Sequence, residues 1–245
     1  MSSELNPDLS RDTLQGGGLV CWQHKEGYRF SLDAILLAHF APLPPGGQVL
    51  DLGAGSGVVG LMAASLEPTI KVISYELQES LLKLIRLNIK ENSLEGRWTA
   101  VAGDVRSRQG LVPEAMDLVL CNPPYGKLGR GRLNPGHEQA VARHELAGEL
   151  ADFVKAAAFS VKNRSPVAFV YPAAELTKLI TTMADFRLEP KRLRLVHSYP
   201  GAPAKLALVS AVKNGGAELQ VAPPLFIYQE RGGEYSAEVA ALFGP

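Results

Sequence analysis

The chain has 245 residues, of which 46% are hydrophobic, and its 25 Lys and Arg residues balance its 25 Asp and Glu residues. A chain of this length and apolar content can bury a core, and it fits one domain with appendages better than two full domains. The zero net charge argues against bulk electrostatic capture of nucleic acid, so a nucleic-acid partner would have to be met by a local basic patch.

The first 45 residues are expected to form a small extension that precedes the main domain. The run 19–40, "LVCWQHKEGYRFSLDAILLAHF", predicts a hairpin that turns at Lys25-Glu26-Gly27, followed by a helix capped by Ser31. The proline-rich segment "APLPPGG" then reads as a linker. Residues 46–245 are expected to form the main domain.

From residue 46 on, short β-branched runs alternate with longer helical patterns. The runs that predict strands are 49–52, 70–76, 97–104, 116–124, 165–172, 191–200 and 205–214, and those that predict helices are 58–66, 78–92, 149–163 and 173–186. Residues 222–239 are expected to form a final hairpin and tail. The alternation predicts an α/β fold of the Rossmann-like, doubly wound class, with a mostly parallel sheet, helices on both faces and an antiparallel terminal strand pair.

Polar residues follow four of the predicted strands. In open α/β sheets, ligands bind beyond the carboxyl ends of the strands, near the point where the strand order reverses. This rule places the glycine turn after residue 52, Glu76, Asp104 and Asn122 along one rim of the sheet. The connection 126–147 is the one long predicted loop, and such loops tend to be functional or disordered.

The segment "DLGAGSG", residues 51–57, follows a strand and opens a helix, so its backbone can approach a ligand closely. Two interpretations are open. Gly55, Gly57 and Gly60 satisfy the dinucleotide pattern G-x-G-x-x-G, and Glu76 lies about 20 residues further on, where that pattern has a ribose-binding acid. However, the Asp51 carboxylate would repel a pyrophosphate, whereas it could accept hydrogen bonds from a cationic amino-acid group. Asp51 therefore favours a ligand with a cationic amino-acid group over a dinucleotide.

This segment resembles the first motif of Rossmann-like methyltransferases that use S-adenosylmethionine. The resemblance implies that Asp51 lies near the methionine part of the cofactor, that Glu76 binds both ribose hydroxyls and that Asp104 faces the adenine. Phe30, Ser31 and Asp33 could close over the cofactor as the equivalent segment does in related enzymes, although a core Phe30 and a capping Ser31 explain that segment equally well. The residues expected at the cofactor are Phe30, Asp33, Asp51, Gly53, Gly55, Gly57, Glu76, Asp104 and Asn122.

Residues 122–125, Asn-Pro-Pro-Tyr, follow the fourth strand of the main domain. The two prolines restrict the backbone, so the Asn122 amide and the Tyr125 ring would be held rigidly, although a plain strand-ending turn would look the same. An exocyclic amine on adenine is a poor nucleophile because its lone pair is delocalised into the ring. Two acceptors that hold both N–H bonds, the Asn122 carboxamide and the Pro123 carbonyl, would stabilise the positive charge that develops during methyl transfer. Tyr125 would stack on the base.

The tetrapeptide resembles the catalytic motif of amino-methyltransferases that act on adenine N6, guanine N2 or protein glutamine amides. Its flanks resemble the bacterial family that methylates N6 of adenine 37 in a valine tRNA, through "GYRFSLDAILLAHFA", "VLDLGAGSGVVGL", "CNPPYG", "ARHEL" and "PLFIY". The resemblance implies that Asn122, Pro123, Pro124 and Tyr125 are catalytic. The segment "GKLGRGRLNPGHEQA" departs from that family because it is richer in glycine and in basic residues, which leaves the exact nucleotide open.

The long loop carries the basic residues that are expected to contact RNA, namely Lys127, Arg130, Arg132 and Arg143. His144 is better explained by positioning, or as a plain loop residue, than as a general base, because a methylated amine can release its proton to water.

Cysteine and histidine usage bears on the redox compartment of the protein and on whether a metal site is expected. Cys21 and Cys121 are the two cysteines and lack Cys-x-x-Cys spacing, and with an amino terminus that is not signal-like they suit a reducing cytoplasm. No pair of the five histidines has a metal-ligand spacing, and no apolar run reaches the roughly 18 residues of a membrane span. Neither a metal site nor a membrane protein is expected.

The function expected from the sequence is methyl transfer from S-adenosylmethionine to the N6 amine of an RNA adenine, with tRNA as the partner. The alternatives within the superfamily are a protein glutamine methyltransferase, which would be expected to carry an extra helical domain, and a guanine-N2 methyltransferase of ribosomal RNA. A nicotinamide-dependent oxidoreductase would leave Asn-Pro-Pro-Tyr unexplained. A binding module without catalysis is disfavoured by the intact Asn122 and Tyr125.

Overall fold

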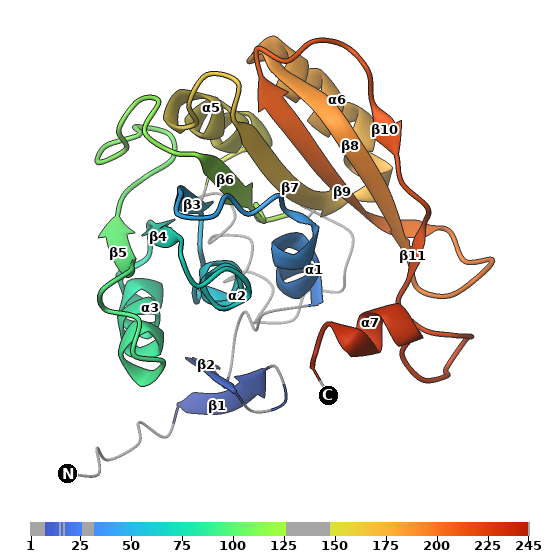
Figure 1. Cartoon of the computed structure of the whole chain (residues 1–245), viewed down its shortest axis with the longest axis horizontal. Helices are drawn as coiled ribbons and strands as arrows, with labels where there is room; N and C mark the ends of the chain where they lie inside the picture. The colour runs from blue at the N-terminus through green and yellow to red at the C-terminus, as the bar shows by residue number, and fades with distance from the viewer. Residues whose placement is uncertain (1–7, 15, 17, 26–31, 126–147, 245) are drawn as a thin grey trace, which may run out of the picture.

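The computed structural model describes residues 8–14, 16, 18–25, 32–125 and 148–244. Within them, a nine-stranded sheet forms the centre of the molecule, and a two-stranded sheet lies near the amino terminus (Figure 1). The strands of the central sheet are β3 (Gln48–Leu52), β4 (Lys71–Glu76), β5 (Trp98–Ala102), β6 (Leu118–Cys121), β7 (Pro166–Pro172), β8 (Leu188–His197), β9 (Ala204–Lys213), β10 (Gln220–Val221) and β11 (Leu225–Phe226).

The strand order is β10-β8-β9-β7-β6-β3-β4-β5, and β11 also pairs with β8. The strands from β7 through β5 in that order are parallel, whereas β9 runs antiparallel to both β7 and β8. The chain moves outward from β3 to β4 and β5 and then returns to β6, on the other side of β3. Leu52 pairs with Cys121 in this register, so the glycine turn and Asn122 leave the sheet side by side. The predicted fold class is confirmed.

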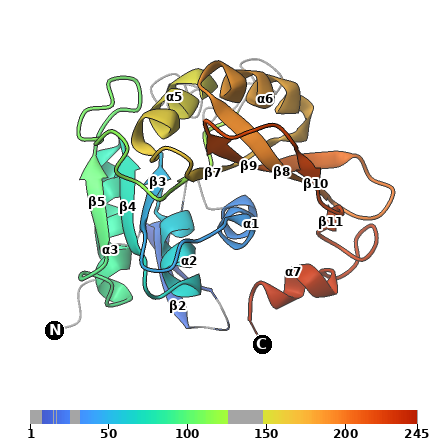
Figure 2. The same cartoon turned by 45° about the horizontal axis from the view of Figure 1, so that its top comes forward.

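Helices cover both faces of this sheet (Figure 2). They are α1 (Leu32–Phe40), α2 (Val58–Leu66), α3 (Glu79–Glu91), α5 (Leu150–Ser160), α6 (Leu176–Asp185) and the short α7 (Ala237–Ala241). Successive strand residues point to opposite faces, so Val49 packs in the core beneath α1, α2 and α3, and Leu50 packs in the core beneath α5 and α6. The rim formed by the carboxyl ends of the strands therefore lies between these two cores.

The amino-terminal hairpin does not turn where the sequence predicted. It consists of β1 (Leu9–Leu14) and β2 (Leu19–His24), and the pairing of Leu14 with Leu19 places the turn between these two residues. The predicted turn at Lys25-Glu26-Gly27 was therefore wrong, since the Lys25 N–H continues the pair and donates to the Asp8 carbonyl at 2.8 Å. The glycine run 16–18 explains the outcome: Gly16 has φ +60°, a conformation in which a Cβ would be strained.

Helix α1 packs inside the main core, where its Ile35 and Leu37 are buried with residues of α2. The division into an extension of residues 1–45 and a domain of residues 46–245 stays a prediction. The carboxyl-terminal expectation was partly wrong. The segment 222–239 first forms β11, which runs parallel to β8, and the expected hairpin follows around an antiparallel bridge between Tyr228 and Tyr235, where the Gln229 N–H donates to the Glu234 carbonyl and the Ser236 N–H donates to the Ile227 carbonyl, both at 2.9 Å. Helix α7 begins at Ala237. Pro223 and Pro224 cannot donate ladder hydrogen bonds, which separates β10 from β11.

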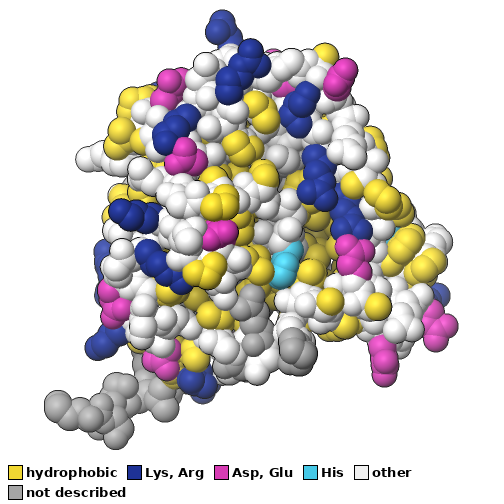
Figure 3. All heavy atoms as spheres, in the orientation of Figure 1, with side chains coloured by type: hydrophobic (Ala, Val, Ile, Leu, Met, Phe, Trp, Pro, Cys, Tyr) yellow, Lys and Arg dark blue, Asp and Glu magenta, His cyan; other side chains and the backbone are white. Residues whose placement is uncertain are grey.

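The face of the molecule in Figure 3 carries Lys and Arg side chains interspersed with Asp and Glu side chains. This agrees with the balanced composition. In the described part of the chain, each helix is too short or too polar to cross a membrane.

Candidate active site

The glycine turn after β3 is fixed by close contacts with both cores. Gly53 has φ +70°, and a Cβ there would lie 2.6 Å from Cε1 of Phe153 on α5. Gly57 has φ +84°, and a Cβ there would lie 2.9 Å from the Trp98 ring. The N–H groups of Gly53 and Ala54 both donate to the Tyr75 carbonyl, at 2.9 and 3.1 Å. Glycine is required at Gly53 and Gly57 by conformation and by space.

Asp51 is turned into the protein and is 1% exposed. Its Oδ2 accepts from the Gly60 N–H at 3.0 Å and from the Ser74 hydroxyl at 3.2 Å, so the carboxylate ties β3 to the first turn of α2 and to β4. Burial, and to a smaller extent the charge of Glu76, raises the pKa of Asp51 to about 7. Since Asp51 engages the Gly60 N–H, this donor at the start of α2 is not free for a pyrophosphate, which counts against the dinucleotide interpretation.

Glu76 links the glycine turn to the start of α3. Its Oε2 accepts from the Gly55 N–H at 2.9 Å, and its Oε1 accepts from the N–H groups of Leu77 and Gln78 at 3.0 and 2.9 Å. The side chain is 6% exposed, and this burial raises its pKa. A carboxylate has about four acceptor positions, and these three bonds leave Oε2 able to accept a further hydrogen bond.

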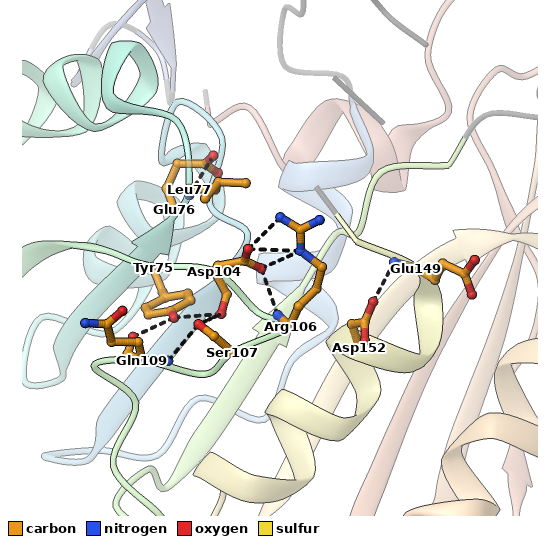
Figure 4. Close-up of polar contacts among 9 residues, drawn as sticks. All are labelled: Tyr75, Glu76, Leu77, Asp104, Arg106, Ser107, Gln109, Glu149 and Asp152. Atoms are coloured by element: carbon orange, nitrogen blue, oxygen red, sulfur yellow. Dashed lines mark hydrogen bonds and ion pairs between the residues drawn. The ribbon is translucent and has the colours of Figure 1, made fainter. Parts of the chain in front are cut away.

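Asp104 follows β5 and is paired with Arg106. The guanidinium faces the carboxylate (Figure 4): Nε lies 2.9 Å from both oxygens, and Nη2 lies 2.6 Å from Oδ2. These hydrogen bonds with Arg106 lower the pKa of Asp104. The Tyr75 hydroxyl lies 3.1 Å from the Asp104 carbonyl and 2.7 Å from the Gln109 carbonyl, which anchors this loop on β4. A ligand at Asp104 would therefore share the carboxylate with Arg106.

Asn122 carries a buried acceptor that is unused. Among the described residues, its Oδ1 has no hydrogen-bond partner and is shielded from solvent. Buried polar atoms in folded proteins are nearly always satisfied, and an unsatisfied one costs about 1 to 3 kcal/mol. The adjoining Pro123 is buried as well and has no N–H with which to fill the acceptor. The site thus presents an unpartnered carboxamide oxygen next to the glycine turn.

Tyr125 completes the motif and is held from two sides. Its hydroxyl donates to Oδ2 of Asp33 on α1, and its ring meets that of Tyr171 edge to face, with centroids 6.0 Å apart and an interplanar angle of 77°. The structure thus brings Asp33, predicted at the cofactor, to the aromatic end of Asn-Pro-Pro-Tyr. Sequence reasoning missed Tyr171. No motif marks it, and only the order of the strands places the end of β7 beside the end of β6.

Several predicted site residues lie outside the described part of the chain, so their roles stay predictions. They are Phe30, Ser31, Lys127, Arg130, Arg132, Arg143 and His144. Within the ranges that the structure describes, no three His, Cys, Asp or Glu side chains are grouped so that they could hold a metal ion.

Comparisons with known proteins show what this chain is similar to. Residues 32–146 match the sequence model of the family described as "Methyltransferase small domain". The chain is 28% identical over 190 residues to a Flavobacteriaceae protein (strain 3519-10), covering 72% of this chain and 79% of that protein. It is 26% identical over 223 residues to a Shewanella loihica protein, covering 88% and 90%. Both relatives are named tRNA1(Val) (adenine(37)-N6)-methyltransferase.

Among solved structures, the fold is similar to that of a predicted O-methyltransferase from Agrobacterium tumefaciens. The TM-score is 0.70 at 22% sequence identity, and the match covers 86% of this chain and 94% of that one. At this identity the likeness concerns the fold.

Proposed function

We propose, from the match of residues 32–146 to the methyltransferase small-domain family, that this chain methylates the N6 amine of an adenine in tRNA, using S-adenosylmethionine. The observation that carries the proposal is the buried Oδ1 of Asn122, which has no hydrogen-bond partner among the described residues and lies beside the glycine turn. The names of the relatives support tRNA as the substrate and adenine 37 as the target. The cytoplasm is the proposed location.

Methyl transfer requires a more nucleophilic amine nitrogen. The nitrogen becomes more nucleophilic when hydrogen-bond acceptors engage both of its N–H groups. Asn122 Oδ1 and the Pro123 carbonyl would accept the two N–H bonds and stabilise the positive charge that grows on nitrogen. This interaction strengthens as the charge develops, so it favours the transition state over the bound substrate. Bound S-adenosylmethionine would supply an electrophilic methyl group. The proton left on the product amine can pass to water.

The residues along the rim fit this cofactor. The left-handed glycines would let backbone approach the ligand closely, and the remaining acceptor position on Oε2 of Glu76 would receive a ribose hydroxyl. Asp51 would act on the methionine part through the first turn of α2, because its own side chain is directed into the protein. Asp104 would face the adenine together with Arg106.

The target base would stack on Tyr125, whose ring is fixed by Asp33 and Tyr171. A base in a tRNA loop is already partly unpaired, so presenting it costs less than flipping it out of a duplex. Because basic and acidic side chains are mixed on the face in Figure 3, local contacts would have to gather the RNA. The residues proposed for those contacts are Lys127, Arg130, Arg132 and Arg143.

The test is incubation with labelled S-adenosylmethionine and total tRNA, followed by digestion to nucleosides. We expect label in N6-methyladenosine. Matched valine tRNA transcripts with adenine or guanine at position 37 locate the target, and the Asn122→Ala protein is the control for contaminating activity. Label in N2-methylguanosine would favour the guanine alternative, and label in a protein fraction alone would favour the glutamine alternative. Binding of NADH without any binding of S-adenosylmethionine would overturn the proposal.

A further inference from the structure

We infer that Asn88 is a positioning residue for the glycine turn and that, through it, the amino-terminal hairpin forms part of the cofactor site. Asn88 lies on α3 and is fully buried. Its Nδ2 donates to the Ser56 carbonyl in the glycine turn at 3.0 Å and to the Trp22 carbonyl in β2 at 3.2 Å, and its Oδ1 accepts from the Trp22 N–H at 2.6 Å. The inference rests on the proposed cofactor.

The side chain of Asn88 uses both of its amide hydrogens and its oxygen in these three bonds. It sits on the buried face of α3, in line with Leu82, Ile85 and Ile89, where the helical period would otherwise place an apolar residue. A buried polar side chain at such a position is tolerated only when its hydrogen bonds are satisfied. The hairpin and the glycine turn supply those bonds.

Asn92 repeats half of this arrangement one turn later. Its Oδ1 accepts from the Val20 N–H at 2.9 Å, and its Nδ2 donates to the Val20 carbonyl at 2.7 Å. Four helical residues rise about 6 Å and two strand residues span about 6.6 Å, so the two carboxamides of α3 match alternate residues of β2. The helix thus pairs with β2 as a neighbouring strand would. Within the described residues, Asn92 makes no hydrogen bond to the glycine turn, which makes it a matched control.

Asn88 contacts the glycine turn at the residue directly before its left-handed Gly57. Ser56 directly precedes Gly57, which has a left-handed backbone and is the residue before the first turn of α2. The preceding residue, Gly55, is held by Glu76, which accepts from its N–H. The two peptide groups that flank the Gly55–Ser56 peptide are therefore each held by a side chain: Glu76 accepts from the Gly55 N–H, and Asn88 donates to the Ser56 carbonyl. Loss of Asn88 would leave the Ser56 carbonyl unpaired in the interior.

Hairpin docking and cofactor binding should consequently be coupled, and such coupling is reciprocal. A docked hairpin holds Asn88 in place and so holds the turn in its binding conformation. Cofactor bound at the turn should in return stabilise the hairpin, whose Val20 and Trp22 N–H groups end on the two asparagines.

The experiment compares Asn88→Ala with Asn92→Ala in the full chain. Calorimetry gives the Kd for S-adenosylmethionine, and denaturant unfolding gives stability. We expect both variants to lose stability, but only Asn88→Ala to raise Kd by about tenfold or more, with Asn92→Ala within about threefold of the natural protein. Asn88→Asp keeps an acceptor for the Trp22 N–H but cannot donate to Ser56, so it should resemble Asn88→Ala in Kd.

A second measurement needs no variant. We expect amide hydrogen exchange at Val20 and Trp22 to slow when S-adenosylhomocysteine is added to the natural protein, beyond any change at Leu179 on α6, which packs in the other core. If the natural protein binds neither cofactor form, the proposed function fails. If it binds them but hairpin exchange is unchanged, or the two alanine variants have equal Kd values, this inference alone is overturned.

Discussion

At the scale of single residues, the site contrasts satisfied and unsatisfied polar groups. Asp51 and Glu76 are buried with their oxygens engaged by backbone N–H groups, whereas Asn122 Oδ1 has no described partner. The first two side chains hold the rim together, so substitutions that remove their acceptor oxygens would disturb structure and function alike. Asn122 contributes an acceptor that the described part of the protein does not use, and this separates its role from stability.

We expect Asn122→Ala to lower the rate of methyl transfer by about 10² or more, because it removes an acceptor that matters most as charge develops on the amine. Affinity for S-adenosylmethionine should be nearly unchanged. The free energy of unfolding should be equal or higher, since a buried unpaired acceptor is removed. Single-turnover kinetics, calorimetry and denaturant unfolding measure the three quantities. Near-normal single-turnover rates would contradict the assignment.

The hydrogen bond between Tyr125 and Asp33 yields a second prediction at this scale. Tyr125→Phe keeps the stacking ring and loses the hydroxyl, while Asp33→Asn keeps an acceptor oxygen of the same size. We expect Tyr125→Phe to reduce kcat/KM for tRNA by about three- to tenfold, and Tyr125→Ala to reduce it by at least tenfold more, because base stacking contributes about 1 to 3 kcal/mol. Steady-state kinetics with tRNA decide. Equal losses for the Phe and Ala variants would exclude stacking.

At the scale of elements, the rim is assembled by contacts that join neighbouring strands to the helices between them. Asp51 connects β3, β4 and the start of α2, and Glu76 connects β4, the glycine turn and the start of α3. Both acids lie in the interior, and burial raises both pKa values. The strands and helices of the rim are therefore joined by two buried carboxyl groups, and the charged forms of these groups disfavour folding.

This arrangement predicts how stability depends on pH. The pKa of Asp51 is about 7 in the folded protein, against about 3.9 for an ordinary Asp, so the native state binds the proton more tightly than the unfolded state. Stability should thus be highest below pH 4 as far as this group is concerned, and should fall as pH rises from about 4 to about 7. Asp51→Asn keeps an acceptor for the Gly60 N–H without the charge.

We therefore expect Asp51→Asn to gain stability relative to the natural protein between pH 5 and pH 8, by roughly 1 to 4 kcal/mol. Glu76 is present in both proteins, so the difference between their curves reports the Asp51 carboxyl together with its repulsion by Glu76. Denaturant unfolding at several pH values provides the measurement. Parallel stability curves for the two proteins would show that Asp51 is ionised without penalty at neutral pH.

At the scale of the whole molecule, the sheet places the residues proposed for the cofactor and those proposed for the target base on different strands. The carboxyl ends of β3, β4 and β5 carry the residues proposed for the cofactor, and those of β6 and β7 carry Asn122, Tyr125 and Tyr171. The chain has no net charge, and one face mixes both signs of charge, so RNA would be gathered by a local group of basic residues.

That group is predicted to be the loop directly after the catalytic motif. We expect the double variant Arg130→Ala with Arg132→Ala to raise KM for tRNA and to reduce the salt dependence of RNA binding by roughly one to two units of slope, because each phosphate contact releases counterions. Affinity for S-adenosylmethionine should stay the same. Lys155→Ala, on the exposed side of α5, is a control of like charge. Binding isotherms at several salt concentrations test this prediction. An unchanged salt dependence in the double variant would show that the loop does not contact the RNA.

The sequence alone determined the class of fold and the motifs, because these depend on local patterns. The alternation of Val49 and Leu50 between two cores depends on neighbouring residues, and so do the two prolines after Cys121 and the left-handed backbone of Gly53 and Gly57. The lack of space for a Cβ at those two glycines is tertiary, because Phe153 and Trp98 fill it. The hairpin turn was mispredicted because Lys25-Glu26-Gly27 and the glycine run 16–18 are both plausible turns. The pairing of Leu14 with Leu19 selected the second.

Only the tertiary structure decided which distant side chains meet. Asn88 contacts Trp22 and Ser56, which are 66 and 32 residues away along the chain, and Tyr125 contacts Asp33, 92 residues away. Such pairs depend on how the crossovers stack helices on the sheet, and no local period encodes that arrangement. The same holds for Asn122 Oδ1. Its residue type follows from the sequence, but that it is buried and unpartnered among the described residues is a property of the packed rim.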